Sequence, residues 1–506
     1  MRSERSVKNS LYAIVGQAVS LIFGFVTRIV FANKLGDAYL GLNNIFYSVL
    51  SLLSLSELGM GAAFTFALYS PIADDDRERI GRVMNLYSAA YRVVAAIVTV
   101  LGLCVVPFLP LITESVPHIS NITLIYLLFL ANSAASYLFS YKRALITASE
   151  QDYKNSVNIS LFSIIQNLLQ LVLLITTGSF VLYVAAQLVC TVASNIAISH
   201  TAGKMFPYLK AVKGFPEKSE LDSIKSNVKA MFMTRFGSVA VTGTDNLLIA
   251  SVDVALVGIY SNYLLLLQTV QVILTQVINA VTASVGNLIA EGSERRGEIY
   301  RNIIFAVAWL YGFSAVALDT LMGRFIEITF GGGDWLLSEA VVHIMALNFL
   351  LAGIRQTNQM FINAGGLFES VKWRGFAEAA VNLGVSALFL FYFDMGLLGV
   401  LLGTTVSHLV VGVIWETVCV GRHCVEGGIR IYAVNNLIYT AVILAVCLIN
   451  RYVCSLIPTT VFGFICAAAI TAILPNLIFA LLSVRTPQLA FFADVAKRMA
   501  GKLLRR

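Results

Sequence analysis

The chain has 506 residues, of which 58% are hydrophobic and 12% are charged, and its mean hydropathy is +0.81. So few charges cannot cover the apolar surface of a soluble domain of this size, so a soluble globular protein is excluded and a polytopic membrane protein is indicated. The formal net charge of +7 comes from basic residues spread over many short segments, which favours contact with anionic lipid over nucleic acid.

Apolar windows of about 20 residues predict about fourteen membrane-spanning helices. They lie near residues 10–32, 40–67, 83–106, 119–140, 159–177, 180–199, 236–252, 257–290, 302–321, 340–363, 375–393, 396–418, 434–453 and 459–482. The first apolar run lacks a small-residue cleavage site, which indicates a retained helix and not a removed signal peptide. The sequence therefore predicts an all-α polytopic membrane protein.

Basic polar segments divide these helices into parts. We expect an N-terminal six-helix bundle at 1–199, a cytoplasmic amphipathic linker at 200–235, a C-terminal six-helix bundle at 236–418, two additional transmembrane helices at 419–482 and a basic cytoplasmic tail at 483–506. Within the linker, Leu221, Ile224, Val228 and Phe232 recur at helical spacing, which is typical of a helix on the membrane surface. Two bundles of the same orientation suggest parallel repeats in a pseudo-twofold arrangement around a central cavity.

The placement of lysine and arginine predicts how the chain is oriented. With the N-terminus in the cytoplasm, most of the 35 basic residues fall on cytoplasmic segments, the linker and the tail included. This asymmetry follows the positive-inside rule and places both termini in the cytoplasm.

We single out five ionisable residues within the predicted helices: Arg28, Glu57, Arg92, Asp245 and Arg355. A charge at bilayer depth costs roughly 2.5–3.5 kcal/mol, so such residues usually line a hydrated cavity or pair with one another. Three arginines against two carboxylates predict a slightly positive cavity, and guanidinium groups match phosphate oxygens in bidentate geometry. We therefore expect the three arginines to bind a phosphate-bearing or otherwise anionic cargo. The alternatives are snorkelling to the outer headgroups for Arg28 and helix packing for Glu57.

Polar stripes follow three of the predicted helices. Their members are Gln17, Ser20, Gly24 and Arg28 on the first helix, Ser163, Gln166 and Gln170 on the fifth, and Gln268, Gln271, Thr275, Asn279 and Thr282 on the eighth. Stripes of this length cannot face lipid, because amides need hydrogen-bond partners there. They either join helices or line a hydrated lumen, and three stripes together with the arginines favour the lumen.

The remaining reactive residues give no sign of catalysis. The chain has no G-x-x-x-x-G-K-S/T phosphate loop, and its predicted outer loops are short and carry no cluster of acids, nucleophiles or metal ligands. The seven cysteines are scattered without metal-site spacing, and we interpret His343 and His408 as packing residues. We therefore expect a transporter and not an enzyme, with no cofactor and no metal.

The N-terminal quarter carries motifs through which the chain resembles a known family. They are Lys8-Asn9-Ser10, then Arg28 and Phe31, then Leu35-Gly36-Asp37-Ala38-Tyr39-Leu40-Gly41-Leu42-Asn43, then Leu55-Ser56-Glu57-Leu58-Gly59-Met60-Gly61-Ala62, and finally Leu68-Tyr69-Ser70-Pro71. Together with the helix number, the basic linker and the basic tail, they resemble the Wzx-type polysaccharide repeat-unit flippases of the multidrug/oligosaccharidyl-lipid/polysaccharide (MOP) exporter superfamily.

This resemblance implies a V-shaped pair of six-helix bundles with a lumen that opens to one side at a time. The implied cargo is an undecaprenyl-diphosphate-linked oligosaccharide, such as a capsule or exopolysaccharide repeat unit. It would move from the inner to the outer leaflet of the bacterial cytoplasmic membrane. Asp245 or Glu57 would bind a proton or sodium ion that resets the empty carrier, and glycosyltransferases and a glycan polymerase would be neighbouring partners.

Other functions stay open at this point. Lipid II flippases of the same superfamily also carry an arginine late in the first helix, as Arg28 is here. A cation-coupled multidrug exporter would need an acidic cavity, whereas this one is expected to be positive. An integral-membrane glycan polymerase would need catalytic residues on outer loops, and a structural scaffold would leave the buried arginines unexplained.

Overall fold

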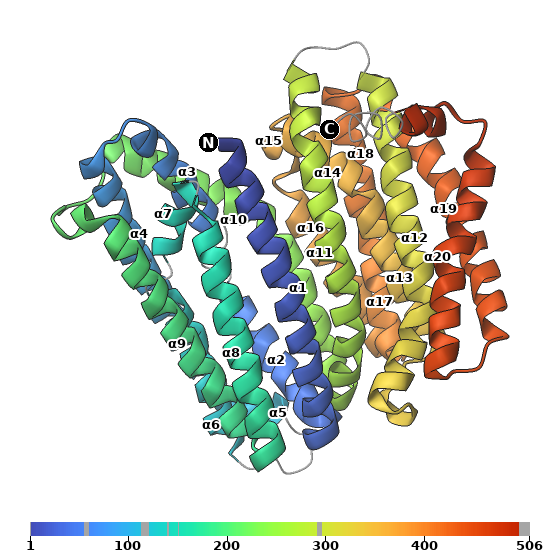
Figure 1. Ribbon diagram of the computed structural model, residues 1–506, viewed down its shortest axis with the longest axis horizontal. Helices are drawn as coiled ribbons and strands as arrows, with labels where there is room; N and C mark the ends of the chain where they lie inside the picture. The colour runs from blue at the N-terminus through green and yellow to red at the C-terminus, as the bar shows by residue number, and fades with distance from the viewer. Residues whose placement is uncertain are drawn as a thin grey trace. The chain divides into compact units, whose positions relative to one another are not determined.

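The computed structural model describes residues 2–54, 60–112, 121–138, 141–149, 151–290 and 296–494. These residues form helices joined by short connections, and no strand occurs among them. The chain divides into two compact units, unit 1 at Met1–Gly258 and unit 2 at Ile259–Arg506 (Figure 1).

Ten helices in the described part are long and apolar enough to cross a membrane, and each coincides with one of the predicted spans. An eleventh predicted span, 119–140, contains the helix Ile122–Tyr137, which lies at 44° to the following helix Lys142–Ala148. The remaining three predicted spans, 10–32, 40–67 and 236–252, are not among these ten helices. The prediction of an all-α polytopic membrane protein is thus confirmed.

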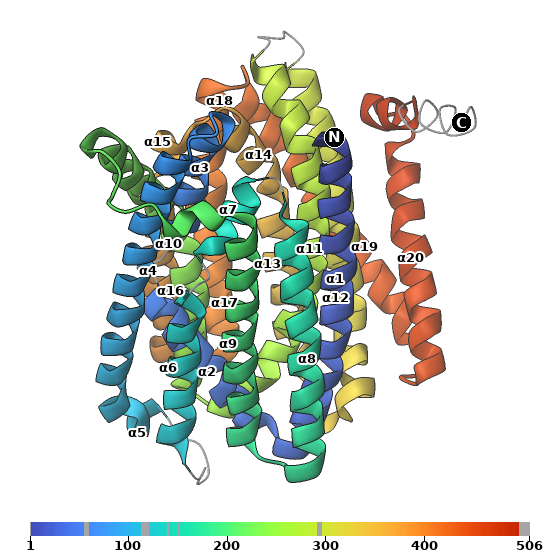
Figure 2. The same ribbon diagram turned by 60° about the vertical axis from the view of Figure 1, so that its left-hand side comes forward.

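Unit 1 contains the helices α1 (Arg2–Leu35), α2 (Asp37–Leu53), α3 (Met60–Ala73), α4 (Arg77–Val105), α5 (Leu109–Ile112), α6 (Ile122–Tyr137), α7 (Lys142–Ala148), α8 (Tyr153–Thr177), α9 (Phe180–Met205) and α10 (Lys218–Ala250). The helices α4, α6, α9 and α8 stand side by side in that order, and α1 packs along α8 (Figure 2). In the core, the Phe46 ring meets Tyr126 at 5.3 Å, and the Tyr126 hydroxyl donates to the Gly102 carbonyl at 3.0 Å.

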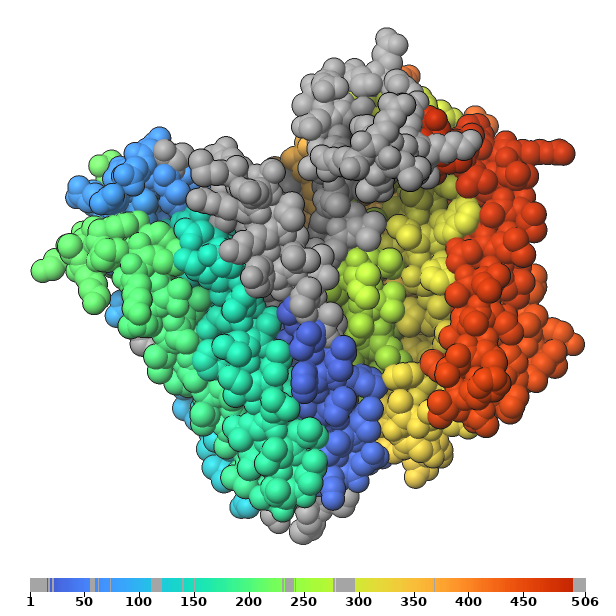
Figure 3. Space-filling view, in the orientation of Figure 1, coloured from blue at the N-terminus to red at the C-terminus, as the bar shows by residue number. Residues whose placement is uncertain are grey.

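The outer face of unit 1 is apolar where lipid is expected. On α8, exposed side chains include Ile159, Leu161, Val172 and Ile175, and this helix forms the teal surface of Figure 3. Because apolar side chains lose little by facing hydrocarbon tails, such a face fits a helix at the edge of a membrane bundle.

The segment that joins the two predicted bundles is organised differently from the prediction. We expected a separate linker at 200–235 followed by a new helix, but α10 runs unbroken from Lys218 to Ala250. An ion pair between Arg79 Nε and Glu220 Oε1 at 2.8 Å holds its start against α4. Near its end, Asn246 Nδ2 donates to Ser48 Oγ of α2 at 2.8 Å. The predicted boundary at 235/236 therefore falls inside one helix that packs within unit 1.

A glycine crossing links α2 with the start of α11 (Val254–Ala290). A Cβ added to Gly41 would lie 1.9 Å from the carbonyl oxygen of Val254. A Cβ added to Gly258 would lie 2.3 Å from the carbonyl oxygen of Asp37. Only glycine permits two backbones to approach this closely.

Unit 2 continues α11 and contains α12 (Arg296–Phe330), α13 (Glu339–Ile354), α14 (Gln356–Ala364), α15 (Phe368–Val371), α16 (Arg374–Ala387), α17 (Gly396–Ser407), α18 (Ile414–His423), α19 (Gly428–Ser455) and α20 (Val461–Ser483). Two π-helical turns, at Leu388–Tyr392 and His408–Val413, extend α16 and join α17 to α18.

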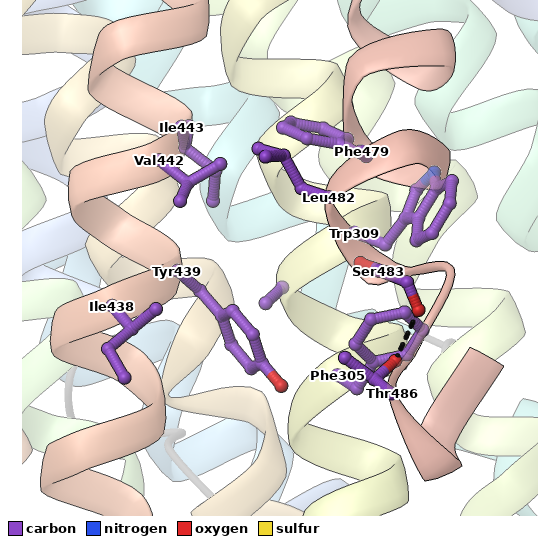
Figure 4. A pocket seen from close by; sticks show the side chains of 11 residues that line it. Phe305, Trp309, Ile438, Tyr439, Val442, Ile443, Phe479, Leu482, Ser483 and Thr486 are labelled. Carbon is purple, nitrogen blue, oxygen red and sulfur yellow. Dashed lines mark hydrogen bonds between the residues drawn. The ribbon is translucent and has the colours of Figure 1, made fainter.

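Between α12, α19 and α20 lies an apolar pocket of about 160 Å³ (Figure 4). Its walls are the aromatic and aliphatic side chains of Phe305, Trp309, Tyr439, Ile443 and Phe479. At its edge the Thr486 hydroxyl donates to the Ser483 carbonyl at 2.7 Å. Among the described residues, its lining contains no charged side chain.

Candidate functional site

A cavity of about 480 Å³ opens in unit 1 where α4, the start of α7, the end of α9 and the segment 206–215 meet. A second cavity of about 410 Å³ shares Lys142 and Lys210 with it. The cationic side chains that line the two cavities are Arg92, Lys142, Lys204, Lys210 and Lys213, and we call this set the basic pocket. No carboxylate belongs to either lining among the described residues. Gathered cations without a counter-ion attract anions.

Local contacts hold the lysine-bearing segment against α4. Pro207 begins the short turn Pro207–Lys210 directly after α9. The Asn85 side chain donates to the carbonyls of Val212 and Gly214 at 3.1 Å each. Gly81 makes room for this approach, because a Cβ there would lie 2.5 Å from the Val212 side chain. These contacts place Lys210 and Lys213 beside Arg92.

Two cations of the basic pocket, Lys142 and Arg92, donate hydrogen bonds to uncharged groups. Lys142 Nζ donates to Ser199 Oγ at 2.8 Å, and Arg92 Nε donates to the Ser88 carbonyl at 3.3 Å. The Arg92 side chain is exposed into the cavity. The charges of these two residues are therefore available to an anion such as a phosphate group.

A buried charge cluster occupies the interior of unit 2. It consists of Arg355, Arg374, Glu378, His408 and Glu416, which come from α16, α18 and the turns between α13 and α14 and between α17 and α18. Arg355 is 4% exposed and Glu416 is fully buried. Charges this deep persist only when they are paired and hydrogen-bonded.

The Arg355 guanidinium uses every one of its donors inside this cluster. Nη1 and Nη2 donate to the two Glu378 oxygens at 2.5 and 3.0 Å. Nε and Nη2 donate to the two Glu416 oxygens at 3.2 and 3.0 Å. The remaining Nη1 donor lies 2.7 Å from His408 Nδ1. Since a guanidinium has five N–H groups, none is left for a cargo.

Glu416 accepts additional bonds from two neighbours. Gln359 Nε2 donates to its Oε1 at 3.2 Å, and Arg374 Nη1 also donates to Oε1. Two arginines and two glutamates thus give the cluster a formal charge of zero when His408 is neutral.

Gly412, on the π-helical turn, provides the space that Arg355 occupies. A Cβ at this position would lie 2.3 Å from Arg355 Cζ. We expect Gly412→Ala to destabilise the protein by about 1–3 kcal/mol, as overpacking of a filled interior does. The measurement is the thermal unfolding midpoint in detergent, with Gly384→Ala of α16 as control. A Cβ at Gly384 meets nothing within 4 Å, so an equal loss in both variants would contradict this reading.

A second histidine, His343, links charged groups of α12, α13 and α19. Its Nδ1 lies 2.5 Å from Asp319 Oδ1 and 3.1 Å from Arg451 Nη1, which lies closer still to its Nε2. Arg451 also pairs with Glu339 at 2.6 Å. The imidazole of His343 therefore lies between an acid of α12 and an arginine of α19.

Within unit 1, the structure does not bring the predicted cargo-binding residues Arg28 and Arg92 together. Arg28 lies one turn before Phe31, whose ring packs on Tyr183 at 4.9 Å near the start of α9. Arg92 lies in the basic pocket, near Gly203 at the end of α9. At 1.5 Å per residue, these two ends of α9 are about 30 Å apart. Arg355 lies in unit 2 with its donors taken, so its predicted role in cargo binding stays a prediction that this geometry does not support.

The remaining predicted residues are placed as follows. Asp245 is buried at 7% exposure on α10, and Glu57 lies outside the described residues. The side chains of Gln17 and Asn279 are also outside the described part.

The described members of the stripe on α11 divide between two environments. Gln268 is exposed, whereas Gln271 Nε2 donates to the Tyr311 hydroxyl of α12 at 3.1 Å. Thr275 Oγ1 donates back to the Gln271 carbonyl at 2.7 Å. Gln271 therefore joins helices, the alternative that the sequence left open.

Three members of the buried charge cluster were not singled out from the sequence: Arg374, Glu378 and Glu416. Glu378 and Glu416 lie within the predicted spans 375–393 and 396–418, so their position alone was a usable signal. They sit close to the ends of those spans, where carboxylates are usually solvated.

The fold is shared with three solved transporter structures. The lipid II flippase MurJ, in an inward closed conformation, matches with a TM-score of 0.67 over 94% of this chain and 99% of its own, at 14% identity. An inward-facing multidrug resistance MATE family transporter of the MOP superfamily matches with a TM-score of 0.58 over 81% of this chain and 98% of its own, at 13% identity. A mutant form of the Vibrio cholerae MATE transporter VcmN matches with a TM-score of 0.54 over 82% and 97%, at 14% identity.

No protein-family model and no curated protein sequence matches the chain. Sequence identity to the three structures is low, so the similarity concerns the fold. The chain is a multi-pass membrane protein with the fold of MOP-superfamily transporters.

Proposed function

We propose that this protein is a flippase that moves undecaprenyl-diphosphate-linked polysaccharide repeat units from the inner to the outer leaflet of the bacterial cytoplasmic membrane by alternating access. The observation that carries the proposal is the basic pocket, with five cations and no carboxylate among the described lining residues. A diphosphate is the part of such a cargo that arginine and lysine bind most strongly.

In the orientation that the positive-inside rule predicts, the basic pocket would lie at the cytoplasmic end of unit 1. Arg92 and the lysines around it would receive the diphosphate there, while the polyprenyl tail stays in the lipid. Arg28 on α1 lies near the other end of α9, about 30 Å from the basic pocket, and would meet the phosphates later in the transfer. Since the two positions are far apart, they act one after the other and not as one clamp.

The membrane potential would drive this direction of transport. Carrying two negative charges outward across about 150 mV releases roughly 7 kcal/mol, at about 2.3 kcal/mol per charge per 100 mV. The membrane potential alone could therefore drive the outward transfer of an anionic cargo, without ATP hydrolysis.

The experiment is a flipping assay in proteoliposomes with a fluorescent undecaprenyl-diphosphate oligosaccharide. Each charge-assisted hydrogen bond contributes about 1.5–3 kcal/mol, so Arg92→Ala combined with Lys142→Ala should slow flipping about tenfold or more. Lys225→Ala is the control, because Lys225 is exposed on α10 outside the pocket. Flipping at the wild-type rate by the double variant would remove the basis of the proposal.

A lipid II flippase is the second candidate, and the similarity to MurJ over nearly the whole chain favours it. Both cargoes carry a polyprenyl diphosphate, so the basic pocket would serve either one. Running the same assay with lipid II as the cargo separates them. Export of cationic drugs is less well supported, because a pocket of lysines and arginine repels cations.

A further inference from the structure

The exposed side of α9, which stands between α6 and α8 in Figure 2, changes from apolar to basic along the helix. The exposed side chains of α9 are, in chain order, Leu182, Val189, Val192, Ile196, His200 and Lys204. They follow one another at steps of three, four or seven residues, so they lie on one face of the helix. An apolar strip that ends in a basic group has the polarity of a phospholipid.

The length of the apolar strip suits the depth of one leaflet. Leu182 and Ile196 are about 21 Å apart at 1.5 Å per residue. One leaflet contributes about 15 Å to a hydrocarbon core of about 30 Å. His200 follows Ile196 after about 6 Å. An acyl chain can therefore contact apolar side chains over its whole depth, and its headgroup then lies beside His200 and Lys204.

The second cavity, of about 410 Å³, lies at the change from apolar to basic. Ile196, His200 and Lys204 of α9 line it together with Lys142 and Lys210 from neighbouring segments. Among the described residues of its lining there is no carboxylate. Three ammonium groups and an imidazole N–H can donate to phosphate oxygens, and the charges attract an anion.

Contacts within unit 1 position these cations and keep the cavity open. Lys142 Nζ donates to Ser199 Oγ at 2.8 Å, which holds the lysine on the face of α9 that lines the cavity. The short turn Pro207–Lys210 follows α9 directly and brings Lys210 back to it. A Cβ added to Gly203, which lines both cavities, would meet nothing within 4 Å. A site arranged in advance loses little entropy when it binds its ligand.

We propose that the second cavity binds an anionic phospholipid of the surrounding membrane, with its phosphate among the three lysines and one acyl chain along α9 from Leu182 to Ile196. Basic pockets between helices at the membrane boundary are typical sites for anionic headgroups. A soluble phosphate would use the lysines alone, whereas a phospholipid also covers the apolar strip. The site goes beyond the proposed function, because this lipid is a resident ligand and not the cargo.

The two cavities can be separated by substitution. Lys142 and Lys210 line both, but Lys204 lines only the second cavity and Lys213 lines only the first. Both Lys204 and Lys213 are exposed and carry the same charge. Removing one or the other therefore distinguishes a lipid in the second cavity from a general attraction between basic residues and anionic lipid.

The first experiment measures lipid binding by native mass spectrometry of the purified full-length protein, with phosphatidylglycerol and phosphatidylcholine of identical acyl chains. The wild type should bind phosphatidylglycerol more tightly. Lys204→Ala should weaken this binding about fivefold, the factor equal to about 1 kcal/mol per lysine near anionic lipid. Lys213→Ala is the control and should bind almost as the wild type does. Equal losses in the two variants would overturn the proposal, and Lys204→Gln replaces the alanine variant if that variant folds poorly.

The second experiment tests the acyl chain with two isoleucines of similar exposure. Ile196 on α9 is 55% exposed and Ile159 on α8 is 52% exposed, but only Ile196 lines the second cavity. Ile196→Ser should weaken phosphatidylglycerol binding about fourfold, the factor equal to about 0.8 kcal/mol for one buried methylene. Ile159→Ser should leave it unchanged. Wild-type binding by Ile196→Ser would contradict a lipid bound along α9.

Competition distinguishes the phospholipid from other phosphates. Inorganic phosphate at the same concentration should leave phosphatidylglycerol bound, and its displacement would reassign the cavity to a soluble anion. Undecaprenyl diphosphate that depends on Lys204, when phosphatidylglycerol does not, would reassign it to the cargo. Binding is measured without flipping, so a protein that binds phosphatidylglycerol here but flips no cargo rejects only the proposed function. A protein that flips cargo but does not prefer phosphatidylglycerol rejects only this site.

Discussion

Replacing Glu416 by Gln is expected to lower the free energy of unfolding by about 3–5 kcal/mol, because it leaves a buried arginine charge without compensation. Glu416 is fully buried and accepts bonds from Arg355, Arg374 and Gln359. After the substitution only Glu378 remains to balance the two arginines. The measurement is denaturant or thermal unfolding of the purified protein in detergent, together with its yield in membranes.

The matched control for Glu416→Gln is Glu339→Gln. Glu339 also pairs with an arginine, Arg451 at 2.6 Å, but its side chain is 83% exposed. An exposed pair contributes about 0–1 kcal/mol, so this variant should unfold almost as the wild type does. Similar losses for the two glutamates would show that burial of the cluster is not what makes Glu416 important.

Gly41→Ala is expected to cost about 3 kcal/mol or more and to reduce the folded protein in membranes severely. The added Cβ would lie 1.9 Å from the Val254 carbonyl oxygen, which is a backbone atom and cannot turn aside as a flexible side chain can. Relief would require α2 to move away from the start of α11. The check is membrane yield and the unfolding midpoint in detergent.

Gly323→Ala of α12 is the control for Gly41→Ala. A Cβ at Gly323 meets nothing within 4 Å. Gly323→Ala should therefore raise the free energy of unfolding by about 0.5–1 kcal/mol, because alanine is more stable than glycine inside a helix. A Gly41→Ala protein as stable as the wild type would mean that the crossing of α2 and α11 can open at little cost.

The membrane-spanning helices could be predicted because hydropathy identifies long apolar runs in the sequence. The ten described spans are continuous apolar runs, and a one-dimensional window detects them directly. The break expected at 235/236 did not occur, because polar composition marks where a helix leaves the membrane and not where it ends. In the resulting helix Ile224 is buried while Lys225 and Lys229 are exposed, and the helix continues through 235/236 without a break.

The candidate sites were predicted less completely, because charge pairing depends on tertiary contacts. Arg355 was recognised as an ionisable residue in a membrane helix, but its partners Glu378 and Glu416 come from other helices. Nothing in the local sequence of Arg355 shows that its donors are already used. Arg92 was placed by counting residues, and its exposure into a lysine-lined cavity depends on how the 206–215 segment folds back on α4.

The continuity of α10 restricts where the chain can change length. Its 33 residues form one rod about 50 Å long, held at one end by Arg79 and at the other by Ser48. One inserted residue would rotate everything after it by about 100° and turn Asn246 away from its hydroxyl acceptor. Insertions and deletions among related chains should therefore avoid α10, because a connection outside a helix can change length without altering the phase of that helix.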